Sequence, residues 1–304
     1  MSTKPARSHA TPRHLWLGVG LIAIFWPLNW FWPDGLTPDN LRTHWGFFPL
    51  WLGYCLTVDG LVARRKGDSL LLRDRRAYVR LFLISAPAWW LFEAINLRTQ
   101  NWEYLGRGLF SAPVNILISS LSFSTVLPAV FGSAELVGTF GWLRRLPRGP
   151  RIAATPRVRL VAALAGATML ALLLGWPRFF YPFVWLSVYF LLEPLNAHLG
   201  FRALTEDTRR GDWRGAVALW VGVLICGFFW EMWNFYSYPK WIYHVPFVDA
   251  FRLFEMPLLG YGGYLPFALE LHAMYHLTTG LLRLPEARGY VRLVDELEWV
   301  DESE

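Results

Sequence analysis

The residues of this sequence that could do chemistry lie in two motifs of the same form. Both read Glu-x-x-Asn followed by Trp-x-Tyr: Glu93, Asn96, Trp102 and Tyr104 in the first, and Glu231, Asn234, Trp241 and Tyr243 in the second. Residues three apart share one face of a helix, so we expect each carboxyl group and its amide to point the same way. A carboxylic acid held among aromatic rings can act as a general acid or base. We therefore take Glu93, Asn96, Glu231 and Asn234 as candidate catalytic residues. A purely structural clamp between helices is the alternative.

The second motif is followed by further polar groups, which favours it as the reactive copy. His244 and Glu255 come shortly after it, and the first motif has no equivalents for them. Glu231 would be the acid, and His244 or Glu255 the base. Aromatic faces attract cations, and the candidate substrate-binding residues are the aromatic side chains near the two motifs: Trp90, Trp102, Trp230, Trp233, Trp241 and Tyr243.

Other polar residues lie in apolar runs and carry weaker predictions. We include Glu270 among the candidate catalytic residues. His272 and His276 have the i,i+4 spacing that can place two imidazoles on one metal. Hydrogen-bonding histidines that line a cavity fit the sequence better, so we expect no metal and no cofactor. Asp59 and Glu193 occur at matching depths in their runs, and we expect nearby arginines to pair with them.

The elements that must position these residues are membrane helices. Apolar residues make up 54% of the 304 residues and charged residues 17%, whereas soluble chains average roughly a quarter charged. A bilayer is spanned by about 20 apolar residues in a helix. Eight runs meet this description: 14–32, 46–63, 77–97, 109–131, 157–176, 180–199, 215–236 and 261–281. The apolar segment 246–260 is too short to span, and we expect an interfacial or re-entrant segment there.

The distribution of basic residues predicts the orientation of these helices. With the amino terminus in the cytoplasm, all but six of the 29 lysines and arginines fall on the cytoplasmic side, the exceptions being Arg42, Arg98, Arg107, Arg178, Lys240 and Arg252. This asymmetry follows the positive-inside rule. We predict that both termini are cytoplasmic and that the protein lies in the inner (cytoplasmic) membrane.

The two motifs are part of a wider internal repeat. Leu127-Pro128 corresponds to Leu265-Pro266, as Asp59 corresponds to Glu193. We predict an all-α protein in which a duplicated four-helix unit gives two parallel repeats. The expected divisions are a basic tail (1–13), the first repeat (14–142), a basic linker (143–156), the second repeat (157–283) and an acidic tail (284–304).

These observations favour an intramembrane enzyme that acts on a lipid or isoprenoid, as a cyclase, hydratase or lyase, in a pocket open to the outer leaflet. In its many helices and intramembrane acids the chain loosely resembles bacterial carotenoid cyclases and hydratases, and no residue role is taken from them. A proton-coupled transporter or lipid flippase is one alternative, and a non-catalytic membrane scaffold is another. The expected partner is a membrane lipid or hydrophobic small molecule. The net charge of +6 comes from basic loops, so we expect no nucleic-acid partner.

Overall fold

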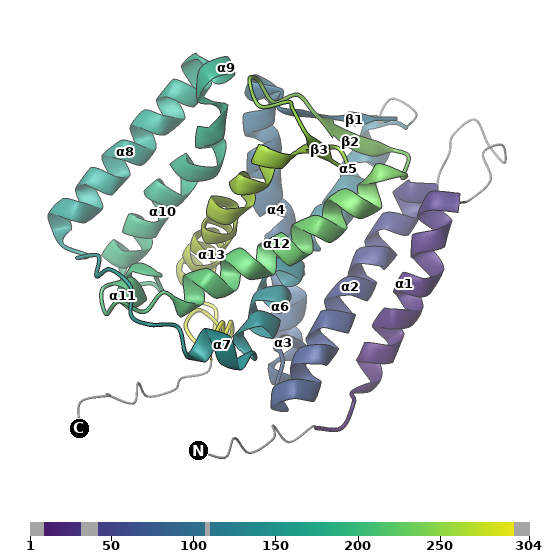
Figure 1. The fold of residues 1–304 in the computed structure, drawn as a ribbon, viewed down its shortest axis with the longest axis horizontal. Helices are drawn as coiled ribbons and strands as arrows, with labels where there is room; N and C mark the ends of the chain where they lie inside the picture. Colours follow the sequence, from purple (N-terminus) through teal and green to yellow (C-terminus); the bar gives the residue numbers. More distant parts are fainter. Residues whose placement is uncertain (1–8, 32–41, 107–109, 295–304) are drawn as a thin grey trace.

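The computed structural model describes residues 9–31, 42–106 and 110–294, and this part of the chain is mostly helical (Figure 1). Among the described residues, six helical stretches are long and apolar enough to cross a membrane. They are α1 (Arg13–Phe31), α2 (Arg42–Lys66), α4 (Arg75–Thr99), α5 continued by α6 (Ala112–Phe123 and Val126–Gly138), α8 (Pro156–Gly175) and α12 (Arg214–Phe235). The chain is therefore a helical, multi-pass membrane protein.

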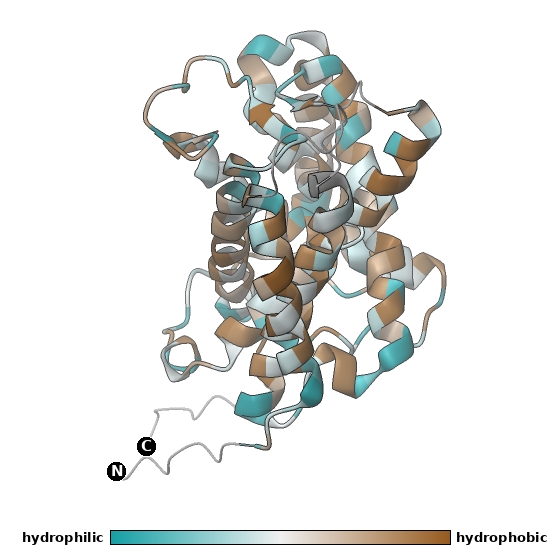
Figure 2. Cartoon of the chain, turned by 90° about the vertical axis from the view of Figure 1, so that its right-hand side faces the viewer, coloured by the Kyte–Doolittle hydropathy of each residue, from teal (hydrophilic) through white to brown (hydrophobic). Residues whose placement is uncertain are grey.

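The outer surface of these helices is apolar. Leu17, Leu83, Leu97 and Val161 are each more than half exposed. Apolar patches of this extent are unfavourable in water, whereas the hydrocarbon of a bilayer accepts them. Hydrophobic residues run along the helices and hydrophilic residues gather toward their ends (Figure 2).

The other two expected spans are helical but are not among those six. The run 180–199 forms α10 (Val184–Leu199) after two short turns, α9 (Pro177–Phe180) and η2 (Tyr181–Phe183). With 16 residues, α10 is shorter than a full span. The run 261–281 forms α13 (Tyr264–Leu281), whose Glu270, His272 and His276 lower its hydropathy.

Four helices form the centre of the molecule, with a helix pair on each side. Figure 1 shows α4, α6, α12 and α13 between the α1–α2 pair and the α8–α10 pair. At the contact between α12 and α6, a Cβ atom on Gly222 would lie 2.5 Å from the backbone nitrogen of Ala134. Small residues let helix backbones approach closely in membranes, and the absence of a side chain at residue 222 permits this contact.

Short strands follow α4 and α12, and the sequence did not predict them. β1 (Trp102–Leu105) pairs antiparallel with β2 (Lys240–Tyr243). The segment expected to be interfacial or re-entrant contains a β-hairpin, β3 (Arg252–Leu253) with β4 (Met256–Pro257), followed by the 3₁₀ helix η3 (Leu258–Gly263). The pairing of β1 with β2 brings the sequences after the two motifs together at one end of the molecule (Figure 1).

The opposite end is built from loops and one-turn helices: α3 (Leu70–Arg73), α7 (Gly141–Arg144) and α11 (Thr205–Thr208). Asp59 accepts hydrogen bonds from the Ser69 hydroxyl (2.7 Å) and the Leu71 backbone N–H (3.0 Å). Glu193 accepts one from the Thr205 backbone N–H (2.7 Å). Asp59 also lies 3.0 Å from His14 Nε2, and the expected pairs with arginines are not found for either carboxylate among the described residues. Backbone N–H groups at the start of a helical turn bind one oxygen of each carboxylate instead, and Glu193 Oε2 has no hydrogen-bond partner among the described residues.

The described part of the acidic tail packs against this end. Arg80 pairs with Glu286 (2.8 Å), and the Tyr290 hydroxyl donates to the Leu70 carbonyl (3.0 Å). The Arg292 backbone N–H donates to the buried Glu135 (2.8 Å). Residues 284–294 thus belong to the folded protein, whereas residues 1–8 and 295–304 of the predicted tails, and Arg107, lie outside the described residues.

Candidate functional site

The asparagine of each motif holds the tryptophan that follows it. Asn96 donates from Nδ2 to the Trp102 carbonyl (2.7 Å), and its Oδ1 accepts from the Trp102 N–H (3.3 Å). Asn234 does the same with Trp241, at 2.7 Å and 2.9 Å. Both asparagines are buried, and each satisfies backbone groups that would otherwise be unpaired. Their role is to fix the strand at the end of the helix.

Glu93 accepts three hydrogen bonds on one oxygen. The Tyr104 hydroxyl lies 2.6 Å from Oε1, and the indole N–H groups of Trp89 and Trp102 lie 3.0 Å from it. Trp89 is one helical turn before Glu93 on α4, and the other two donors come from β1. The carboxyl group therefore orients three aromatic rings at once.

Glu231 has a different set of donors. Its Oε1 accepts from the hydroxyls of Tyr243 (2.7 Å) and Tyr264 (2.6 Å). The indole N–H of Trp241 donates to the Tyr243 hydroxyl (2.9 Å). Glycine, at residue 227, stands one turn before Glu231 where Trp89 stands in the first motif, and the ring of Tyr264 packs over it. Glu231 Oε2 is buried and has no hydrogen-bond partner among the described residues.

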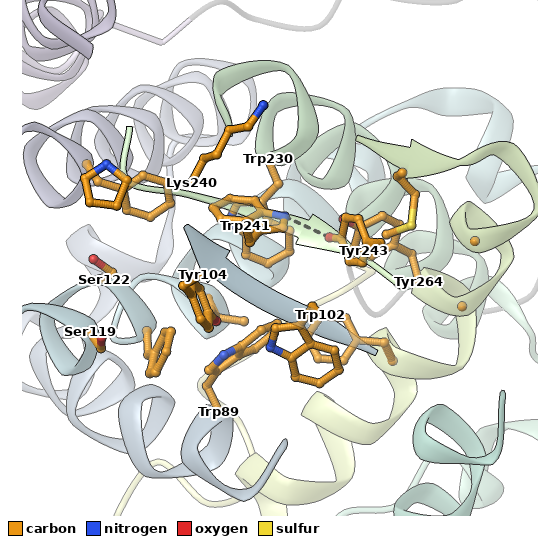
Figure 3. Close-up of a pocket in the computed structure, with 18 of the residues that line it drawn as sticks. Trp89, Trp102, Tyr104, Ser119, Ser122, Trp230, Lys240, Trp241, Tyr243 and Tyr264 are labelled. Carbon is orange, nitrogen blue, oxygen red and sulfur yellow. Dashed lines mark hydrogen bonds between the residues drawn. The ribbon is translucent and has the colours of Figure 1, made fainter. Parts of the chain in front are cut away.

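The rings that the two glutamates hold form one wall of a large pocket (Figure 3). Its empty volume, counted out to its mouth, is about 1130 Å³. Five tryptophans line it, together with Tyr104, Tyr243 and Tyr264, and they come from both halves of the chain: Trp89, Trp102, Trp185, Trp230 and Trp241. Phe47, Phe123, Phe267 and Met256 add apolar surface. Pockets for apolar ligands have this composition.

The polar atoms of the wall are few and come mainly from side chains anchored behind it. Lys240, Ser119 and Ser122 also line the pocket, whereas neither Glu93 nor Glu231 does. Burial, followed by the charge of Glu231 and its hydrogen bond, raises the pKa of Tyr243 well above 10.0. Burial and Glu93 act in the same way to raise the pKa of Tyr104. Both phenols are therefore neutral hydrogen-bond donors at ordinary pH.

Two expected catalytic residues of the second motif lie outside the pocket. His244 is about half exposed and lies 3.0 Å from the equally exposed Glu103. Glu255 forms an ion pair with Lys240, which lines the pocket. Sequence order places both residues near Glu231. Tyr243 points to that carboxyl group, however, and side chains alternate along an extended chain, so His244 points away from it.

Three more candidates lie elsewhere in the packed helices. Trp233 packs against Trp51, with ring centroids 5.1 Å apart. The indole of Trp90 donates to Ser120 (3.0 Å). Glu270 is buried and accepts a hydrogen bond from the Tyr189 backbone N–H of α10 (3.3 Å). The structure therefore brings Trp102, Trp230, Trp241 and Tyr243 to the pocket, but not these three residues.

The two weak metal candidates also lie away from the pocket. His272 and His276 have ring centroids 4.3 Å apart, and His276 Nδ1 lies 3.0 Å from the Ala287 carbonyl. No third histidine, cysteine, aspartate or glutamate among the described residues joins them in a group that could hold a metal ion.

Several lining residues were not among the candidates. Tyr104 belongs to the first motif, and the Trp-x-Tyr repeat indicates it as the counterpart of the candidate Tyr243. Trp89 lies four residues before Glu93 of the same motif. Tyr264 lies in a glycine-rich stretch that suggests only a break before a helix. Nothing in the local sequence of Trp185 or Phe267 distinguishes them from ordinary core residues.

Comparisons of this chain with protein-family models, with curated proteins and with solved structures found no match. The function must therefore be argued from the pocket and its side chains.

Proposed function

We propose that this chain is a membrane-embedded enzyme that acts on an unsaturated lipid of the isoprenoid class within the aromatic pocket. The observation that supports this proposal most directly is the position of Glu93 and Glu231. Each buried carboxyl group lies immediately behind the pocket wall and holds the phenols and indoles that form it. An apolar pocket alone would bind lipid, and the carboxyl groups add a source of protons.

The composition of the wall selects the class of substrate. A lining of aromatic rings favours the binding of an apolar chain. A carbon–carbon double bond in that chain has no polar group that would need a hydrogen-bond partner in the pocket. Protonation of the double bond creates a carbocation, and the faces of tryptophan and tyrosine attract cations by up to about 2 kcal/mol or more when water is excluded. Five indoles around one volume suit this chemistry better than they suit a polar substrate.

The two glutamates differ in a way that suits two roles. Three donors converge on Glu93, an arrangement that suits a carboxylate anion, which would stabilise positive charge in the pocket. Glu231 has one oxygen without a partner, and a buried neutral acid costs less than a buried, incompletely satisfied anion. Sites in which one carboxyl group is held as an anion and the other as a neutral acid are typical of acid–base catalysis.

In the resting site Tyr243 and Tyr264 each donate their hydroxyl proton to Glu231 Oε1. In the proposed reaction one of these hydroxyls turns toward the pocket and gives its proton to one carbon of the double bond. Glu231 gives its own proton to that phenol oxygen, which leaves a carbocation in the pocket and a carboxylate behind the wall. For ring closure, a second double bond of the substrate attacks this carbocation and a ring cation forms. A carbon next to the cationic centre then loses its proton to the phenol oxygen, and the phenol gives its own hydroxyl proton back to Glu231. The net result is movement of the double bond or ring closure, with no co-reactant.

We further propose that the chain has eight spans in two parallel repeats and that both termini lie on the cytoplasmic side of the inner membrane. The matched asparagine clamps, and the matched backbone bonds to Asp59 and Glu193, support the duplication. The pocket lies at the end with few basic residues, so it would face the outer leaflet.

A variant that fills the pocket tests the proposal. Ser122 lines the pocket, and its neighbour Leu121 on α5 does not and is 41% exposed. Native mass spectrometry of the detergent-purified protein should show a bound lipid in the wild type and in Leu121→Phe, but not in Ser122→Phe. Lipid extracts of cells that produce these three proteins should show a new product for the first two only. Identical extracts from cells with and without the wild-type protein would contradict the enzyme and leave a carrier or scaffold.

A further inference from the structure

A second cavity lies at the opposite end of α12 from the aromatic pocket. Its wall includes Arg214, where α12 begins, whereas the pocket wall includes β2, which follows the end of α12. Its empty volume, counted out to its mouth, is about 2520 Å³. The linker between α7 and α8, the segment around α11, one residue of α13 and the segment 288–294 enclose it. We call it the basic cavity.

Arginine dominates the wall of the basic cavity. Eight arginines and two aspartates line it. Two of the arginines come from the linker, four from residues 202–214 and two from the segment after α13. A general excess of basic residues on one side of a membrane protein explains arginines in loops. It does not explain why three separate segments direct arginines around one volume.

The carboxylates of the wall neutralise only a minority of this charge. Asp207 pairs with Arg202 (2.6 Å) and Asp212 with Arg214 (2.7 Å). The guanidinium groups of Arg151 and Arg209 form no hydrogen bond or ion pair with the described residues. Like charges gathered around a low-dielectric cavity repel one another and raise the local concentration of anions. The cavity therefore favours a ligand with several negative charges.

A buried histidine adds an unused polar atom to the same wall. His272 of α13 lines the basic cavity, and only 2% of its surface is exposed. Its Nδ1 has no hydrogen-bond partner among the described residues. Buried polar groups nearly always have a partner, and this inaccessible nitrogen beside the cavity is left without one among the described residues.

We propose that the basic cavity binds an anion that carries two or more phosphate groups. The planar guanidinium group matches the spacing of phosphate oxygens and bonds them in pairs. One phosphate group would leave most of the arginines unbalanced, whereas two or more can engage several segments of the wall together. The ligand is either the headgroup of an anionic lipid, as basic pockets on the cytoplasmic side of membrane proteins bind, or a soluble diphosphate. This inference is independent of the reaction in the aromatic pocket.

Thermal unfolding of the full chain in nanodiscs distinguishes a lipid headgroup from a soluble diphosphate as the ligand. One sample uses phosphatidylcholine alone, a second adds inorganic pyrophosphate at matched ionic strength, and a third contains phosphatidylcholine with cardiolipin. A higher unfolding midpoint with pyrophosphate identifies a soluble diphosphate site. A higher midpoint only with cardiolipin identifies a lipid headgroup site. If neither addition raises the midpoint, the proposal is wrong.

Two double variants distinguish a built site from general surface charge. Arg151→Gln with Arg209→Gln removes two arginines of the wall and should weaken binding of the effective ligand by at least about tenfold, the loss of one charged hydrogen bond or more. Arg64→Gln with Arg145→Gln removes the same charge from exposed positions outside the wall and should bind as the wild type does. Equal weakening in both double variants would overturn the proposal.

Discussion

Trp102 and Tyr243 lie directly opposite each other in the β1–β2 ladder, as Tyr104 and Trp241 do. Each tryptophan of one motif therefore faces the tyrosine of the other across an antiparallel pair. The arrangement joins the two motifs into one wall, so Glu93 and Glu231 serve a single pocket rather than two separate sites. It also means that damage to either motif should disturb the same pocket.

The asparagine clamps should contribute to stability in both halves. Asn234→Ala removes the two hydrogen bonds to Trp241, and Asn96→Ala removes the two to Trp102 and one from the Asn101 N–H. Each change leaves a tryptophan carbonyl without its side-chain donor, which should lower the free energy of unfolding by about 1–3 kcal/mol. Thermal unfolding in detergent would measure the change. Glu103→Gln, an exposed substitution in the same strand, is the control. Full stability in either alanine variant would show that its clamp does not hold the strand.

Glycine is required at residue 227 if Tyr264 is to reach Glu231. A Cβ atom there would lie 2.9 Å from the tyrosine ring, so Gly227→Ala should displace the phenol, with a cost of about 1–3 kcal/mol, and should weaken lipid binding. Gly20→Ala is the control, because no atom lies within 4 Å of a Cβ at that helical position. The unfolding midpoint and the lipid mass adduct should both change in the first variant only.

The membrane character and the pocket's main motif could be predicted from the sequence because both are local patterns. A run of about 20 apolar residues is long enough to span a bilayer as a helix. The i,i+3 spacing of Glu231 and Asn234 places them on one face of a helix, and this does not depend on the rest of the fold. The repeat also relates Trp102 to Trp241, which lie near each other only after folding.

The remaining part of the site depends on contacts that local sequence does not encode. Tyr264 donates a hydrogen bond to Glu231 from 33 residues away in the sequence. The glycine-rich stretch around Tyr264 indicates a turn and does not indicate this contact. His244 was expected to act with Glu231 because it follows in sequence, yet the direction of β2 carries it to the surface beside Glu103. Glu255 was expected as a base, and Lys240 neutralises it. The position of Tyr264 arises from the packing of α13 against α12, and that of His244 from strand pairing, and an apolar pattern dominated by helices predicts neither.

The phenols of the wall should make the protein less stable at alkaline pH. Burial first, and Glu231 second, raise the pKa of Tyr243 above its ordinary 10.0. Below pH 10 the phenol is protonated in both the folded and unfolded chains, so the full stability is present. As the pH rises further, the unfolded chain releases its proton first, and the free energy of unfolding falls.

Unfolding midpoints measured from pH 8 to about pH 11 should therefore decline in the wild type and decline less steeply in Tyr243→Phe. Tyr236→Phe removes a phenol that is 60% exposed and should follow the wild type. An identical decline in all three proteins would show that the buried phenol does not control the alkaline limit.

The proposed proton transfer predicts that substitution of two buried glutamates, Glu231 and Glu270, has different effects on product formation. Glu231→Gln keeps a carbonyl oxygen for Tyr243 and Tyr264 but cannot give or take a proton. Product formation should fall by about 10²–10⁴-fold, the usual contribution of a general acid, while the bound lipid is still detected by native mass spectrometry. Glu270→Gln alters an equally buried acid that does not hold the pocket wall, and its product yield should match the wild type. If both variants lose product and stability together, the glutamates hold the helices in place and the acid–base reaction has to be given up. If Glu231→Gln alone loses product and keeps its lipid, the proton that Glu231 carries is the one that the reaction consumes.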